Sequence, residues 1–362
     1  QASGAVLVRY GETVVLVTST ASKEAREGMD FFPLTVDYEE KMYAVGKMPG
    51  GFLRREGRPG NSAILNARLI DRPIRPLFDK RCRNDIHVMA TVLSVDYDNA
   101  PELCGMLGAS ASLGISDISW DGPIAGVRVG RIDGQFVINP TQEQLKVSTL
   151  NITVAGSETA ILMVEGGAQE APEEDVLDAI MFGHETIKEL VAFQKKIIEE
   201  VGKLKRTLIF PEIPEEIKTA IYAYAERPLK EAIFNPDKLT REAHMEEVRK
   251  EAEAHFKEIY PENGSDIAEC LNHLTKEIVR HMISVDKIRP DGRALDEIRP
   301  ISCEVGLLPR VHGSALFTRG QTQIMTITTL APLSEAQKID GLDANETSKR
   351  YMHHYNFPSY SV

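Results

Sequence analysis

A strand–turn–strand pattern occurs twice in this sequence, once near its start and once near its end. The segment Gly4–Ala21 (GAVLVRYGETVVLVTSTA) resembles the segment Gly313–Leu330 (GSALFTRGQTQIMTITTL). Each has two runs of β-branched and apolar residues on either side of a turn glycine, Gly11 in the first copy and Gly320 in the second. A repeat at this separation predicts a duplicated domain.

The secondary-structure pattern changes twice along the chain and divides it into three regions. Residues 1–203 alternate β-rich runs with helical ones, whereas residues 204–286 have no strand signal and residues 287–362 return to strand patterns. The middle region predicts three helices, near Glu215–Phe234, Thr240–Tyr260 and Ser265–Ser284. We therefore predict an α+β fold with a first core, an all-helical domain and the beginning of a second core.

The second copy of the repeat is followed by far fewer residues than the first. A globular domain that ended there would leave an exposed sheet edge and half of a core, which is unstable. We therefore expect the natural protein to continue beyond Val362. Because the chain does not open with Met, we also expect its natural start to precede Gln1.

Composition favours a soluble protein of a reducing compartment. The chain is 42% hydrophobic and 27% charged, and none of its apolar runs approaches the roughly 18 residues that a membrane helix needs. Because its opening residues have a strand-and-turn pattern, we expect no signal peptide. Its four cysteines have no CxxC pairing or zinc-type spacing: Cys82, Cys104, Cys270 and Cys303. These features predict a cytoplasmic location without a membrane partner.

Charge is distributed unevenly. The chain has a net charge of −12, yet the segment from Arg54 to Arg83 has nine basic residues and only three acids, a local charge of +6. An acidic protein with one concentrated basic segment is a candidate for binding a polyanion at one place.

That basic segment begins with a glycine-framed loop, the opening of Gly51–Phe78. Glycines flank Phe52–Arg55, so that an aromatic ring and guanidinium groups lie on a flexible loop. A ring that stacks on a base and arginines that bind phosphates suit single-stranded nucleic acid. A solvated basic loop without a ligand is the alternative that the residues leave open.

A helix predicted after this loop adds three more arginines. Asn61 and Ser62 are candidate caps, and Arg68, Arg72 and Arg75 follow at i, i+4 and i+7, the spacing of one helical face. We expect Pro73 to end the helix and to place Arg72 and Arg75 in an extended turn.

Familiar catalytic motifs are absent from the sequence. There is no GxxxxGK[ST] loop, GxSxG elbow, HExxH pair or GxGxxG turn. The acidic run Glu170–Asp175 is explained by the preference of a helix N-terminus for negative charge. No residue is therefore assigned as catalytic or as a metal ligand.

The basic segment also carries a family resemblance. The stretch DFFPLTVDYEEKMYAVGKMPGGFLRREGRPGNSAILNARLIDRPIRPLF (Asp30–Phe78) resembles the first core of the polynucleotide phosphorylase family. The resemblance continues in VEGGAQEAPEEDVLDAIMFGHE (Val164–Glu185), RPDGRALDEIRPI (Arg289–Ile301) and HYNFPSYSV (His354–Val362). It implies two RNase PH-like cores of the ribosomal protein S5 domain 2-like βαβ type, joined by a helical domain over residues 204–286.

The resemblance implies a phosphate-dependent 3′→5′ exoribonuclease that releases nucleoside diphosphates from single-stranded RNA and that also runs in reverse as a polymerase. It implies Mg²⁺ and inorganic phosphate, with their binding residues downstream of Val362, so that this chain alone is expected to be inactive. It further implies a homotrimeric ring around an RNA channel. It is also consistent with an RNA-degradation complex that contains a helicase or an endoribonuclease.

The resemblance assigns RNA contacts to the basic segment. Residues matching Phe52, Arg54 and Arg55 line a constriction of the channel, and residues matching Arg58, Arg68, Arg72 and Arg75 lie in the same neighbourhood. Leu53 stands where relatives often have a second aromatic residue, which predicts weaker stacking.

Two alternatives to the enzyme stay open in the sequence. One is a non-catalytic RNase PH-like ring subunit that binds and threads RNA. The other is a single-core RNA-trimming phosphorolase, which the helical region and the repeat oppose. A Ser-Ser pair with a downstream Asp and Lys beyond Val362 would favour the enzyme over the ring subunit.

Overall fold

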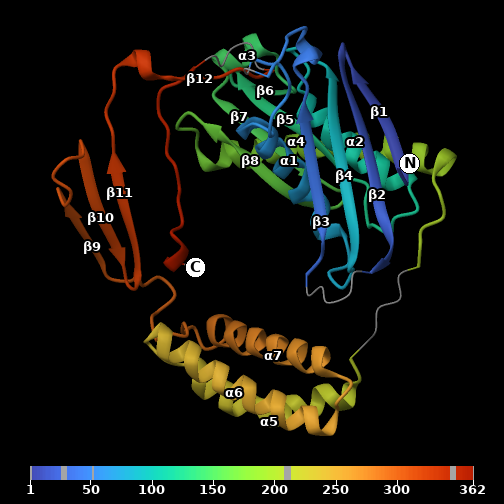
Figure 1. Ribbon diagram of the computed structural model, residues 1–362. Helices are drawn as coiled ribbons and strands as arrows, with labels where there is room; N and C mark the ends of the chain where they lie inside the picture. Colours follow the sequence, from blue (N-terminus) through green and yellow to red (C-terminus); the bar gives the residue numbers. More distant parts are fainter. Residues whose placement is uncertain (1, 26–30, 51–52, 208–212, 343–347, 362) are drawn as a thin grey trace. The chain divides into compact units, whose positions relative to one another are not determined.

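The computed structural model describes residues 2–25, 31–50, 53–207, 213–342 and 348–361 (Figure 1). The chain forms two compact units. The first comprises Gln1–Phe210 together with Glu335–Val362, and the second comprises Pro211–Ser334.

A four-stranded sheet opens the first unit. Its strands are β1 (Gly4–Tyr10), β2 (Thr13–Ala25), β3 (Leu34–Glu40) and β4 (Asn84–Ser94), in the order β1-β2-β4-β3. Strand β3 runs parallel to β4, whereas the other neighbours are antiparallel. Alternate residues of β2 and β4 are fully buried and form one apolar face: Val15, Val17, Val88, Ala90 and Val92.

Two helices pack against the buried face of this sheet, α1 (Asn61–Ile74) and α2 (Pro101–Ile115). Helix α2 consists largely of small residues, so it can approach β1 and β2 closely. A Cβ atom at Gly108 would lie 2.4 Å from Cγ2 of Val17, which only glycine avoids.

The second sheet of this unit is entirely antiparallel. Its strands are β5 (Ala125–Ile132), β6 (Gln135–Ile138), β7 (Leu150–Gly156) and β8 (Ile161–Ala168), in the order β6-β5-β7-β8. The long helix α4 (Glu173–Val201) packs on β5 and β7, and α2 contacts strands of both sheets (Figure 1). A short helix that the sequence did not predict, α3 (Gln142–Val147), begins with a capping box formed by Thr141 and Gln144.

The acidic residues at the start of α4 lie at the helix N-terminus, as expected from the preference of that end for negative charge. Glu173, Glu174 and Asp175 occupy the first turn of α4, and Asp175 forms an ion pair with Arg131 of β5.

The second unit contains the three predicted helices, α5 (Glu215–Ile233), α6 (Lys238–Ile259) and α7 (Gly264–Ser284). They enclose their own core, in which Ile221, Phe256 and Leu271 are buried. Among the helices of the described ranges, none combines the length and the apolarity that crossing a bilayer requires.

The duplicated hairpin is confirmed in both units. Strands β10 (Gly313–Arg319) and β11 (Thr322–Thr328) pair in the same register as β1 and β2, and β9 (Ile301–Val305) lies on the other side of β10. The two turn glycines, Gly11 and Gly320, both have φ of 59°, a left-handed conformation that glycine adopts without strain.

Two local predictions about α1 are wrong. Gly60 occupies the N-cap position of α1, and no side chain caps the helix. The Ser62 hydroxyl instead donates to Oε1 of Glu40 at 2.9 Å. The helix also passes through Pro73 and continues as the 3₁₀ turn η2 (Arg75–Leu77), with the Arg75 amide bonded to the Asp71 carbonyl. A proline in the last turn removes only one helical donor, so the helix tolerates it.

Candidate nucleic-acid interface

The described part of the basic loop, Leu53–Gly60, joins the 3₁₀ helix η1 (Met42–Val45) and its following residues to α1. All of these loop residues are exposed. Arg54 has a positive φ of 52°, so the backbone bends sharply at this arginine. Phe52 lies outside the described residues, and its stacking on a base stays a prediction.

Four of the predicted RNA-contacting arginines have no partner among the described residues. Arg54, Arg55, Arg58 and Arg68 are exposed, and none forms a hydrogen bond or ion pair with the part of the chain that the structure describes. Their guanidinium groups are therefore available to an external anion, and phosphate oxygens match the guanidinium fork.

Arg72 and Arg75 have internal partners instead. Arg72 forms an ion pair with Glu165 of β8 and donates to the Val164 carbonyl at 3.3 Å. Arg75 donates from Nε and Nη2 to the two carboxylate oxygens of Asp71, at 2.8 and 2.6 Å. An RNA contact by these two arginines stays a prediction, and their immediate effect is to attach α1 to its neighbours.

Arg75 also reaches the edge of the first sheet. Its Nη2 donates to the Leu34 carbonyl at 3.0 Å, and its guanidinium carbon lies 5.9 Å from the centre of the Phe32 ring. Among the described strands β3 is the outermost of its sheet, and Arg75 provides the Leu34 carbonyl with a donor on that open side.

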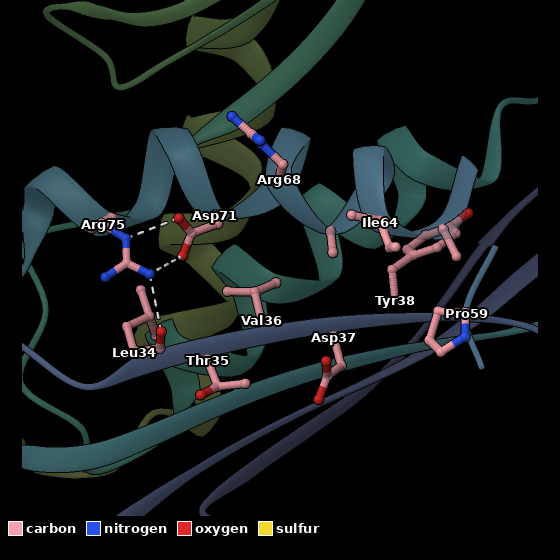
Figure 2. A pocket seen from close by; sticks show the side chains of 12 residues that line it. Leu34, Thr35, Val36, Asp37, Tyr38, Pro59, Ile64, Arg68, Asp71 and Arg75 are labelled. Carbon is pink, nitrogen blue, oxygen red and sulfur yellow. Dashed lines mark hydrogen bonds and ion pairs between the residues drawn. The ribbon is translucent and has the colours of Figure 1, made fainter. Parts of the chain in front are cut away.

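A cavity of about 340 Å³ lies between β3 and α1, as Figure 2 shows. Thr35, Val36 and Asp37 line it from the strand, and the Arg75–Asp71 pair lies at one end (Figure 2). Sequence reasoning missed this groove because it arises where α1 crosses a strand that is remote in sequence.

A buried tyrosine and half-buried carboxylates lie beneath the N-terminal end of α1. Burial, with the nearby carboxylates of Glu102 and Glu40, raises the pKa of Tyr38 well above its usual value, so this phenol stays neutral. Burial likewise raises the pKa of Glu40, which accepts the Ser62 hydrogen bond. Glu102 pairs with Arg128 at 2.6 Å. The Ser62–Glu40 hydrogen bond thus connects the start of α1, and with it the end of the basic loop, to β3.

Within the described ranges, no three His, Cys, Asp or Glu side chains gather into a group that could hold a metal ion. No metal-dependent step is therefore assigned to these residues.

Comparison with known families decides the classification. Residues 1–119 and 297–362, together more than half of the chain, match the model described as 3′ exoribonuclease family, domain 1. The chain belongs to the 3′ exoribonuclease family. Residues 122–186 match domain 2 of the same family, and residues 216–294 match the model described as polyribonucleotide nucleotidyltransferase, RNA binding domain.

Curated members of this family resemble the whole chain. It is 58% identical over 362 residues to the polyribonucleotide nucleotidyltransferases of Heliobacterium modesticaldum and of Syntrophomonas wolfei, and 56% identical over 364 residues to that of Geobacillus kaustophilus. All of the chain is covered in each comparison, but only 50–51% of each relative, so the chain spans about half the length of the curated relatives it matches.

These matches confirm the predicted fold class. The two segments that match domain 1 contain the two copies of the hairpin, and the RNA-binding model covers α5, α6 and α7. The chain therefore combines RNase PH domains with an intervening helical region.

Proposed function

We propose that this chain acts within a polyribonucleotide nucleotidyltransferase, which shortens single-stranded RNA from its 3′ end with inorganic phosphate and releases nucleoside diphosphates, reversibly. The curated relatives bear this enzyme name, and the order of the matching domains along the chain supports it. The alternative, a ring subunit without catalysis, is not favoured by these relatives.

The contribution of this chain is to hold the RNA. The observation that carries this assignment is a group of exposed arginines without a partner among the described residues, Arg54, Arg55, Arg58 and Arg68, in a chain whose net charge is −12. Each guanidinium that binds a phosphate releases a condensed counterion, which provides affinity independent of base sequence. For the whole protein we propose a homotrimer in the cytoplasm, dependence on Mg²⁺, and association with a helicase or endoribonuclease.

The test is removal of two loop charges from the full-length protein. We expect Arg54→Ala with Arg55→Ala to weaken binding of a single-stranded oligoribonucleotide and to reduce the log–log salt slope by about 1.4, since each phosphate contact contributes about 0.7. The control is Lys195→Ala with Lys196→Ala, which removes two adjacent exposed charges from α4 of the same unit, the first of them paired at the surface with Glu158.

The control should leave both affinity and slope unchanged. Equal affinities and slopes for the loop variant and the wild type would show that this loop is not the RNA interface. Release of nucleoside diphosphate from RNA and phosphate by the full-length wild type tests the activity itself.

A further inference from the structure

An acid lies in the middle of the basic loop. Glu56 follows Arg54 and Arg55 directly and precedes Arg58 by two positions. A carboxylate in this place opposes the attraction of the arginines for phosphate. Among the described residues it forms no ion pair with these arginines.

Glu56 instead bonds to the backbone at the other end of the loop. Its Oε1 accepts a hydrogen bond from the Met42 amide at 3.2 Å. Met42 is the first residue of η1, where an amide has no acceptor within the helix. The preceding residue, Lys41, provides no side-chain cap, so Glu56 satisfies this donor from 14 residues away.

The helix η1 is itself firmly attached to the first core. Met42 and Ala44 are only 7% and 8% exposed. The Val95 amide, just after β4, donates to the Ala44 carbonyl at 3.1 Å, and the Lys47 amide donates to the Met42 carbonyl at 3.0 Å. The Glu56 contact therefore connects an exposed loop to a fixed part of the fold.

The N-terminal stem of the loop contacts residues 340–342, which follow β12 (Gln337–Lys338) in the same unit. A Cβ atom at Gly50 would lie 2.0 Å from Oδ2 of Asp340, so this acid sits directly against the glycine. Leu342 is 6% exposed and belongs to the first core, and Lys47 Nζ donates to the Gly341 carbonyl at 3.4 Å. Both stems of the loop thus have contacts that restrict its path.

We propose that Glu56 is a positioning residue for the RNA-binding loop: by capping η1 it holds Arg54, Arg55 and Arg58 in the conformation that meets the phosphates. This inference rests on the proposed function, because it concerns the same interface. Ordering the loop before RNA arrives reduces the conformational entropy lost on binding.

The negative charge of Glu56 weakens RNA binding, whereas its capping of η1 strengthens it. Two substitutions can separate these effects. Glu56→Gln removes the negative charge but keeps an oxygen that accepts from Met42, whereas Glu56→Ala removes both. If only charge matters, both variants bind RNA equally, and more tightly than the wild type. If Glu56 positions the loop, the two variants differ.

The experiment measures single-stranded RNA affinity of the full-length protein by fluorescence anisotropy, and hydrogen exchange of the Met42 amide without RNA. We expect Glu56→Gln to bind at least as tightly as the wild type. We expect Glu56→Ala to bind roughly three- to tenfold more weakly than Glu56→Gln, with faster exchange at Met42.

Equal affinities of the two variants, or unchanged Met42 exchange in Glu56→Ala, would overturn the inference. The exchange measurement needs no RNA, so it separates this result from failure of the proposed function. That failure would appear as unaltered RNA binding when Arg54 and Arg55 are replaced.

Discussion

Arg75 and Arg68 lie on the same helical segment but have different surroundings, and replacing each by alanine separates structure from RNA binding. Arg75→Ala removes two hydrogen bonds to the Asp71 carboxylate and one to the Leu34 carbonyl. Arg68→Ala makes the same change in charge but removes no interaction with the described residues. It is therefore the matched control.

The cost of Arg75→Ala follows from these contacts. The Arg75 and Asp71 side chains are 42% and 23% exposed, so solvent screens the ion pair to about 0.2–1 kcal/mol. The bond to the Leu34 carbonyl contributes about 0.5–1.5 kcal/mol. We therefore expect the free energy of unfolding of the first unit to fall by roughly 1–2 kcal/mol. Arg68→Ala should change it by less than about 0.5 kcal/mol.

The chain has its own reporter for this measurement. Trp120 is its only tryptophan and is 7% exposed, and its indole Nε1 donates to the Ile74 carbonyl at 3.1 Å, one residue before Arg75. Urea unfolding followed by Trp120 fluorescence therefore reports on this end of α1. In parallel, RNA affinity should fall for Arg68→Ala.

Equal unfolding midpoints for Arg75→Ala and Arg68→Ala would refute the argument. That result would mean that water replaces the Arg75 contacts without loss, and that both arginines are ordinary surface charges.

Two further predictions concern the first core and its thiols. Burial raises the pKa of the Cys104 thiol to about 12, so at pH 8 in the native state an alkylating reagent should modify the exposed Cys303 and spare Cys104, as mass spectrometry would show. Gly108→Ala should lower the free energy of unfolding by about 1–2 kcal/mol in the same Trp120 assay. The added methyl group meets the fully buried Val17, and the resulting strain exceeds the gain of about 1 kcal/mol in helix propensity. Unchanged stability would show that Val17 can move aside.

Much of the fold was predictable because its signals are local. Alternating β-branched residues and a turn glycine identify the hairpins at Gly4–Ala21 and Gly313–Leu330, and charged amphipathic runs identify α5, α6 and α7. One of the two errors at α1 was decided by a group remote in sequence. Ser62 bonds to Glu40 of a neighbouring strand instead of capping its own helix.

The basic segment was recognisable from charge and glycine spacing, but those patterns treat all of its arginines alike. In these patterns Glu56 counts only as one negative charge that reduces the net positive charge of the segment. Its bond to Met42 depends on the path of the loop back to η1, which no spacing rule describes.

The sequence by itself determined the order of the elements, the duplication and the place where positive charge gathers, because each depends on residues close together in the chain. Only the tertiary structure decided which arginines remain free. Arg72 meets Glu165 and Arg75 meets Leu34, across separations of 93 and 41 residues, while Arg68 meets no described partner. Ion pairs and hydrogen bonds act over a few ångströms in space, so folding selects the partners of chemically identical side chains.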